Sequence, residues 1–591
     1  MDNNLTKKTR AQKGIVRNRE LEKRMASLSL EEQLTEVLMA PWQRRMELIL
    51  SSAQARQLVQ AMPQQELFWT IKAIGPESSL HILELALPEQ LQFFFDLDWW
   101  KRDEPSPQRI LSWLLVLFEL GKGPNLSWIR WITARDQWLI PAILPLFLRV
   151  EKRPDDMDIQ EAKDTLPAFT LDEIYYIAFR NDKIAPAMAM LLTNLLEAGP
   201  EIYRDVMEAM VWNTPSENRE KALRLRKSRL NDLGLNDYFD SLDIYAPLTP
   251  DEMHETGAAK PLMGKMIQDL PMPAFIPTLY LDAAPLFMQA VQRLQGNQEM
   301  ARIVYETVGV VNKVIMVDEV DLDDMEAISS TIEKAFGLIN LGLESASSSL
   351  GLAPEEVLKG RYMEELVRLG YSALRQLRRM ARRVLELEPS RFLPEGKRQM
   401  LEALTRPTPL HLPEHEEQER PFLSVTQLQE AFRGLIDAEL MVRAAKSLTP
   451  APGEWREKIL EPLDWTRTNL LSDAEFDLEI ALNTAAANCL LDRGLVLAPL
   501  SQEDLCSLRA VFARNDADAI RKKQIDLVER FFGEEEGKSV SAPFLEGQAL
   551  RKQGAGLANR LVSSIKQQVM EGGQKSPDAR FISGLLVLTE G

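Results

Sequence analysis

Short amphipathic segments that restart at proline are the feature that most constrains the fold of this chain. Three prolines, Pro63, Pro76 and Pro88, follow one another at intervals of 13 and 12 residues. A proline lacks the amide hydrogen that a helix interior needs but fits the first helical position, so each one ends a helix and begins the next. Helices this short bury little apolar surface alone. We therefore expect them to stack side by side into a superhelical array.

The apolar residues between these prolines follow the periodicity of an α-helix. Before Pro63 they recur at i, i+3, i+4 and i+7, which places them on one face of a helix. The following segments repeat the pattern, and Gly75 stands directly before Pro76. The positions expected to be buried are Ala55, Leu58, Val59, Met62, Leu67, Phe68, Ile71, Ile74, Leu80, Leu83, Leu87, Leu91, Phe94 and Phe95. The sequence thus favours a solenoid-like repeat over a row of unrelated helices in an ordinary α-helical domain.

Helical patterns interrupted by prolines recur, less regularly, in residues 151–260. Pro186 and Pro200 interrupt helical patterns there. Thr170 and Glu173 match the Ser/Thr-x-x-Glu capping box, which predicts a helix in the residues that follow. We interpret this stretch as a second, divergent helical-repeat-like domain.

The remaining length indicates several further domains. At 591 residues the chain exceeds a single core, since cores stop growing near ~250 residues. Proline-rich segments at 261–285 and 406–421 are typical of linkers or long surface crossings. Helical periodicity dominates elsewhere, so we predict an all-α, multi-domain protein with very little sheet. The predicted domains are a basic flexible tail (1–28), a superhelical repeat domain (29–150), a second helical-repeat-like domain (151–260), two helical bundles (286–405 and 422–532) and a C-terminal extension (533–591).

Two resemblances bear on this architecture. Residues 51–98, with the helix start PEQL at 88–91, resemble the superhelical cytosolic N-terminal domain of MgtE-type magnesium transporters. This resemblance implies a superhelical shape and carries over no ligand residues, because the transporters' membrane region has no counterpart here. The whole chain, including FDLDWWKRDEP at 95–105 and NLGLES at 340–345, resembles an uncharacterised family of large bacterial helical proteins.

Cysteine content and hydrophobicity indicate the cellular compartment. Cys489 and Cys506 are the only cysteines, so the chain has no disulfide framework, as is usual in a reducing cytoplasm. The N-terminus carries no hydrophobic signal core. The most apolar stretches, 110–118 and 138–148, are shorter than the ~20 residues of a spanning helix and predict a buried helical hairpin. We therefore expect a cytoplasmic protein without a transmembrane segment.

One segment matches a metal-site motif. His411, Glu414 and His415 fit the H-x-x-E-H pattern, in which two histidines on one helix face bind zinc and the glutamate activates water. Pro413 stands between the histidines and favours a new helix start there, which disrupts the i, i+4 geometry. We therefore predict no metal and no cofactor, and keep a metal-dependent hydrolase centred on these three residues as an alternative.

Six acidic residues cluster ahead of Ile328. A calcium loop needs glycine at its sixth position, which this stretch lacks. Acids at a helix N-terminus explain the cluster more simply, because the helix dipole favours negative charge there. A magnesium-responsive role, suggested by the transporter resemblance, is the alternative. The clustered residues are Asp318, Glu319, Asp321, Asp323, Asp324 and Glu326.

One basic face contrasts with the net charge of -18. Five arginines recur at i, i+3, i+4, i+7 and i+8 and so share one side of a predicted helix. Such a face suits phosphates or an acidic partner, unless it pairs with the acidic surface of the same chain. The arginines are Arg375, Arg378, Arg379, Arg382 and Arg383.

No motif in the sequence names a reaction. The chain has no phosphate loop and no dinucleotide fingerprint, and Gly370-Tyr371-Ser372 lacks the second glycine of a nucleophile elbow. We predict a non-enzymatic cytoplasmic scaffold or adaptor that binds another protein through its helical-repeat surface. The hydrolase is one alternative. A nucleic-acid accessory factor that uses residues 375–383 is the second, although the excess of acidic residues disfavours nucleic acid as a partner.

Overall fold

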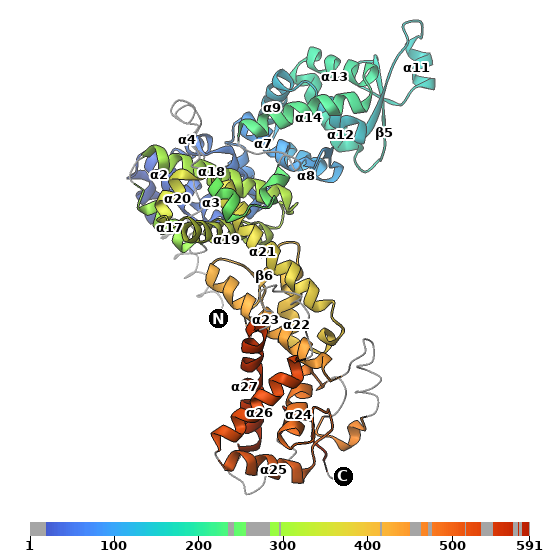
Figure 1. Ribbon diagram of the computed structural model, residues 1–591. Helices are drawn as coiled ribbons and strands as arrows, with labels where there is room; N and C mark the ends of the chain where they lie inside the picture. The colour runs from blue at the N-terminus through green and yellow to red at the C-terminus, as the bar shows by residue number, and fades with distance from the viewer. Residues whose placement is uncertain are drawn as a thin grey trace, which may run out of the picture. The chain divides into compact units, whose positions relative to one another are not determined.

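The computed structural model shows a chain built mainly of helices (Figure 1). The structure describes residues 19–233, 241–255, 284–294, 297–413, 416–448, 463–470, 475–514, 516–533, 548–570, 577 and 582–589. Within these residues the strands are at most 5 residues long, which confirms the prediction of an all-α, multi-helix protein with very little sheet. Of the predicted basic tail, residues 1–18 lie outside the described part, and residues 19–26 are helical.

The chain folds into two compact units, each assembled from several stretches of sequence. Unit 1 comprises Met1–Ala246, Thr256–Phe336 and Leu352–Val367, and unit 2 comprises Pro247–Glu255, Gly337–Gly351 and Arg368–Gly591. Two long helices, α19 (Met325–Leu350) and α21 (Met363–Leu385), belong partly to each unit. The finer division into six domains stays a prediction.

Helices in the proline-punctuated segment begin where the sequence predicts. Pro63 is the N-cap of α5, and Pro88 is the first residue of α7. Pro76 precedes a short 3-10 helix, and α5 packs against both α3 and α7. The superhelical arrangement of these helices stays a prediction. Their bounds are α2 (Leu30–Met39), α3 (Trp42–Leu50), α4 (Ala55–Ala61), α5 (Gln64–Ile74), η1 (Glu77–Ser79), α6 (Leu80–Leu83) and α7 (Pro88–Asp98).

Helices α5 and α7 are buried on all sides rather than along one face. Every residue of Glu66–Lys72 and of Gln90–Asp98 is buried. Their polar side chains therefore need partners inside the unit. The Gln90 amide, for example, donates to the carbonyl oxygens of Val59 at 3.0 Å and Met62 at 2.9 Å. These two helices lie in the interior of unit 1. The sequence pattern predicted burial along only one face of each helix.

The two most apolar stretches do not form the predicted hairpin. The first lies in α8 (Pro107–Glu119), and α9 (Lys122–Arg135) follows it. The second is divided among α10 (Leu139–Ile143), η2 (Leu144–Leu146) and strand β3 (Leu148–Lys152), because Pro145 supplies no amide hydrogen to a continuing helix. Within the described ranges, no helix combines the length and apolar character that crossing a bilayer requires.

The capping-box residues of 170–173 form a turn between strands instead of a helix start. The Thr170 hydroxyl accepts from the Glu173 amide at 2.9 Å, and Asp172 accepts from the Tyr175 amide at 3.0 Å. The aromatic and β-branched residues that follow then favour a strand. The helix predicted through Ile174 and Ile177 is therefore wrong. The antiparallel sheet has the order β3-β5-β4, with β4 (Phe169–Thr170) and β5 (Tyr175–Phe179).

Elsewhere in unit 1 the predicted helices are present. Pro186 and Pro200 lie in the first turns of α12 and α13. Residues 303–317 are rich in β-branched side chains, yet they are helical within α18. The remaining elements of the unit are β1 (Trp100–Lys101), β2 (Glu104–Pro105), α11 (Ile159–Thr165), α12 (Ala185–Ala198), α13 (Pro200–Trp212), α14 (Pro215–Asp232), η3 (Leu242–Tyr245), α17 (Pro285–Gln292), α18 (Asn297–Val317) and α20 (Pro354–Gly360).

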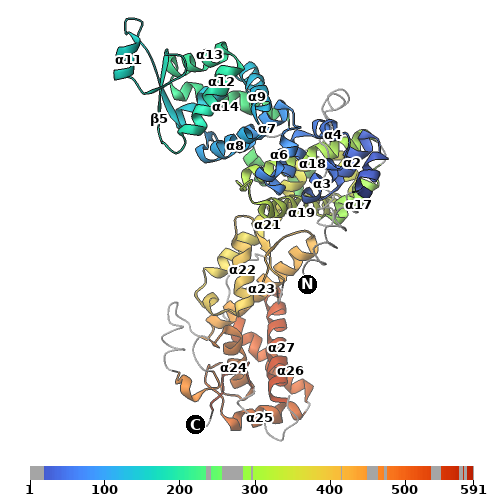
Figure 2. The same cartoon turned by 180° about the vertical axis from the view of Figure 1, so that it is seen from behind.

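Unit 2 is built around α24 (Leu478–Leu490), in which every residue except Glu479 is buried. Helix α27 (Gln548–Met570) packs along it, and the two lie side by side in both views (Figures 1 and 2). The other elements of the unit are α16 (Pro250–Glu255), η5 (Glu388–Phe392), α22 (Glu395–Thr405), β6 (Leu410–His411), β7 (Arg420–Pro421), α23 (Val425–Lys446), η7 (Trp465–Arg467), α25 (Gln502–Ala513) and α26 (Ala517–Phe532).

The described segment 582–589 completes this core. Leu586 and Val587 are fully buried. Their amides donate to Thr484 Oγ1 on α24 and to Asn469 Oδ1, both at 2.8 Å. The Leu500 amide donates to the carbonyl oxygen of Leu586 at 2.9 Å. The segment is thus held by polar groups that come from three earlier parts of unit 2.

Candidate functional site

The motif around His411 is not a helical metal site. His411 lies on strand β6, which pairs with β7, and not on the helix that the zinc motif requires. Its ring lies 5.2 Å from that of Phe422 between centroids, and its Nε2 is 3.7 Å from Glu430 Oε2. Burial lowers the pKa of His411, which favours the neutral imidazole.

The other two motif residues, Glu414 and His415, lie outside the described residues. In the part of the chain that the structure describes, no group of three or more His, Cys, Asp or Glu side chains is placed to hold a metal ion.

The acidic cluster makes hydrogen bonds and ion pairs with other residues of unit 1. We call residues 318–324 the acidic loop. Asp318 accepts a hydrogen bond from the Tyr245 hydroxyl at 2.9 Å and pairs with Lys334. Asp324 accepts from the amides of Glu326 at 3.1 Å and Ala327 at 3.0 Å, and so caps α19. The prediction of helix N-terminal acids is confirmed for Asp324.

Three basic residues from distant parts of unit 1 neutralise the rest of the acidic loop. Arg102 pairs with Glu319, Arg109 with Asp321, and Lys72 with Asp323. Glu319 has a lowered pKa because it accepts hydrogen bonds from the Arg102 guanidinium. Asp318, Glu319, Asp321 and Asp323 therefore already have cationic partners within the protein.

Lys72 and Arg109 also converge on a buried carboxylate, Asp98. The Lys72 Nζ is 2.6 Å from Asp98 Oδ2, and both side chains are 3% exposed. The Trp113 indole donates to the same oxygen at 2.6 Å, while Arg109 Nη1 is 3.3 Å from Asp98 Oδ1. Lys72 and Arg109 thus neutralise carboxylates of both the acidic loop and α7.

The five predicted arginines of α21 do not all face solvent. Arg378 donates through Nε to the carbonyl oxygen of Thr405 and through Nη1 to that of Pro407, both at 3.1 Å. It therefore ties α21 to the end of α22. The exposed arginines are Arg375, Arg379, Arg382 and Arg383, and we call these four the arginine face. Among the residues that the structure describes, Arg375, Arg379 and Arg382 have no ion-pair partner.

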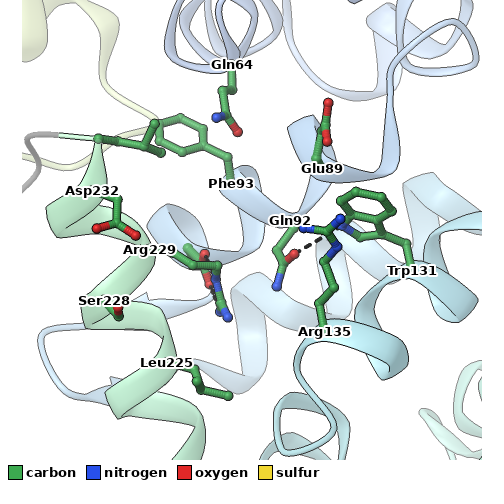
Figure 3. A pocket seen from close by; sticks show the side chains of 12 residues that line it. Gln64, Glu89, Gln92, Phe93, Trp131, Arg135, Leu225, Ser228, Arg229 and Asp232 are labelled. Carbon is green, nitrogen blue, oxygen red and sulfur yellow. Dashed lines mark hydrogen bonds and ion pairs between the residues drawn. The ribbon is translucent and has the colours of Figure 1, made fainter. Parts of the chain in front are cut away.

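Sequence reasoning missed a pocket of about 490 Å³ in unit 1 (Figure 3). Helices α5, α7, α9 and α14 surround it. Its lining combines aromatic and aliphatic side chains with charged ones. The lining residues are Gln64, Glu89, Gln92, Phe93, Asp96, Trp131, Arg135, Leu225, Ser228, Arg229, Asp232 and Leu233.

An ion triad of two buried carboxylates and the partly buried Arg229 supports one wall of this pocket. Arg229 on α14 donates through Nε and Nη2 to the two oxygens of Asp96 on α7, both at 2.7 Å. The same Nη2 lies 2.8 Å from Asp136 Oδ2. Burial raises the pKa of Asp96 and Asp136, and it does so more than Arg229 lowers it. Burial alone would lower the pKa of Arg229, but its bonds to Asp96 and the charges of both carboxylates raise it.

The opposite wall joins three side chains of α7 and α9. The Trp131 indole donates to Gln92 Oε1 at 3.2 Å. The guanidinium carbon of Arg135 lies 4.0 Å from the centroid of the Trp131 ring. Gln92 is 5% exposed, and no hydrogen-bond partner for its Nε2 is found in the part of the chain that the structure describes. Figure 3 shows Gln92, Trp131 and Arg135 side by side at the pocket.

One sequence signal points to part of this pocket. The segment 91–100 is apolar except for Gln92, Asp96 and Asp98, and acids inside an apolar helix must be paired when they are buried. The sequence does not name their partner, because Arg229 is 133 residues from Asp96.

Comparisons with known proteins identify the family of the chain. A family model covers residues 22–588, so the chain belongs to the Family of unknown function (DUF6178). This confirms the resemblance to an uncharacterised family. No curated protein and no solved structure matches the chain. The resemblance of residues 51–98 to MgtE-type transporters is not shown by these comparisons.

Proposed function

We propose that this member of the DUF6178 family is a non-enzymatic scaffold or adaptor that binds an acidic segment of another protein through the arginine face of α21. The observation that carries the proposal is that Arg375, Arg379 and Arg382 are exposed and have no ion-pair partner among the described residues, in a chain of net charge -18. A guanidinium group pairs with a carboxylate through two parallel hydrogen bonds. Clustered arginines on one helix therefore suit an acidic peptide.

The helix that carries these arginines is firmly held. Leu374, Leu377 and Val384 on its other side are buried. A Cβ atom on Gly370 would collide with the carbonyl oxygen of Leu338, so α21 crosses α19 where only glycine fits. A rigid helix loses little conformational freedom when a partner binds, which favours affinity.

The proposal includes two further expectations. The first is a cytoplasmic location in a bacterial cell, supported by the low cysteine content and by Cys489 and Cys506 not being joined in a disulfide. The second is a superhelical surface in residues 51–98 like that of the MgtE-type transporters, supported by helix starts at Pro63 and Pro88.

Fluorescence anisotropy tests the proposal directly. The full-length protein is titrated into a labelled poly-glutamate peptide and, separately, into a labelled single-stranded DNA. The variant Arg375→Glu/Arg379→Glu/Arg382→Glu is expected to bind the peptide at least about tenfold more weakly, because three attractive charges become repulsive. The control, Arg514→Glu/Arg521→Glu/Lys522→Glu, makes the same charge change at exposed sites of unit 2, at the C-cap of α25 and on α26, and is expected to bind like the parent.

Two results would count against the proposal. Equal weakening by the two triple variants would show that only net charge matters. Tighter binding of DNA than of peptide, lost in the α21 variant, would favour the nucleic-acid alternative.

A further inference from the structure

We propose that the pocket between α5, α7, α9 and α14 is a binding site for a small monocarboxylate with an apolar or aromatic body. The pocket lies in unit 1, whereas the arginine face lies in unit 2, so this site is independent of the proposed scaffold function. Its volume of about 490 Å³ is in the usual range for small-molecule sites.

The first argument is an unsatisfied donor. Gln92 Oε1 accepts from the Trp131 indole, so the amide orientation is fixed and its Nε2 lies on the other side. Among the described residues this nitrogen has no hydrogen-bond partner, and the side chain is only 5% exposed to solvent. A buried N–H group without an acceptor costs free energy, and a ligand oxygen in the pocket would remove that cost.

The second argument is a positioned cation. Arg135 lies one helical turn beyond Trp131 on α9 and covers its ring. It is exposed and, among the residues that the structure describes, has no ion-pair partner. Arg229 differs, because Asp96 and Asp136 already neutralise it. Arg135 is therefore the cation that is available to an anionic ligand.

The remaining lining selects among anions. Phe93, Trp131 and Leu225 offer an apolar surface for the body of a ligand. Glu89 and Asp232 are exposed lining residues, and their charge repels a multiply charged anion such as phosphate more strongly than a monoanion. A single carboxylate on an apolar body fits both features.

The test uses the full-length protein and three probes: phenylacetate, its neutral analogue phenylacetamide, and inorganic phosphate. Binding is measured by ligand-observed NMR titration. Phenylacetate is expected to bind at least about tenfold more tightly than the other two. Absence of phenylacetate binding, or equal binding of phosphate, would overturn the proposal.

Two variants locate the binding. Arg135→Gln is expected to weaken phenylacetate binding about tenfold at an unchanged melting temperature, because Arg135 is exposed. Gln92→Met, nearly equal in size, is expected to weaken it as well. Arg204→Gln on α13, whose parent side chain is 66% exposed, is the matched control and is expected to bind like the parent. Parent-like binding by Arg135→Gln would show that the site lies elsewhere, and this variant decides the question even if Gln92→Met does not fold.

Discussion

The acidic loop of unit 1 and the arginine face of unit 2 are both dense charge clusters in the sequence, yet the fold treats them in opposite ways. The acidic loop receives Lys72, Arg102 and Arg109 from positions more than 200 residues earlier. The arginine face receives no carboxylate from the described residues at Arg375 or Arg379. The contrast teaches that a charge cluster is structural when the fold brings it opposite charges, and is available for binding when it does not.

The largest expected effect on stability comes from removing a cation that pairs with the acidic loop. Lys72→Met removes the cation between Asp98 and Asp323, and leaves a carboxylate that is 3% exposed with weaker compensation. We expect a loss of about 3 kcal/mol in the free energy of unfolding, measured in urea. Lys122→Met, which breaks an exposed pair with Glu197, is the control and is expected to cost less than about 1 kcal/mol. Equal losses of stability in the two variants would contradict the stabilising role of the buried Lys72 ion pairs.

A smaller effect concerns acid pH. The pKa of Glu319 in the folded protein is below its ordinary 4.5, so its contribution to stability is complete above about that pH and is lost as the pH falls through the folded value. The pair is partly exposed, so we expect less than about 1 kcal/mol from it. Arg102→Gln should flatten the dependence of unfolding on pH between about 3 and 5. An unchanged slope in that variant would show that Glu319 does not depend on Arg102.

The smallest expected effect on stability comes from replacing residues of the arginine face. Because Arg375, Arg379 and Arg382 are exposed, their joint replacement by glutamate should change the free energy of unfolding by less than about 0.5 kcal/mol. Chemical denaturation of the triple variant checks this. Arg378→Met is the informative comparison, since it removes the hydrogen bonds to the carbonyl oxygens of Thr405, at the end of α22, and Pro407, and should cost about 1 kcal/mol more. A strongly destabilised triple variant would place the arginine face among the structural clusters.

Local chemistry predicted much of the fold. The helix starts at Pro63 and Pro88 follow from a proline's missing amide hydrogen, which acts within a few residues. The turn at Thr170 shows the limit of such reasoning. Its hydroxyl caps an amide three residues later in a helix start and in a strand turn alike, and pairing of β5 with β3 decides between them.

The pocket was beyond local reasoning for a related reason. Helical periodicity places Gln92 and Asp96 on α7, but it does not say that Arg229 and Trp131 face them. The arginine face could be located from spacing alone, yet the structural role of Arg378 depends on the carbonyl groups at the end of α22. Residues that share a helix face therefore cannot be assigned a structural or a binding role until their contacts with distant segments of the chain are known.

The position of segment 582–589 has a consequence for the order in which the chain matures on the ribosome. Asn469 and Thr484 are made 118 and 102 residues before the backbone amides that they bind. Every stretch of unit 1 has been translated once Val367 is made, whereas the buried residues Leu586 and Val587 of unit 2 are translated well after that point. Since folding during translation proceeds from the N-terminal side, unit 1 can fold before segment 582–589 is available to complete the core of unit 2.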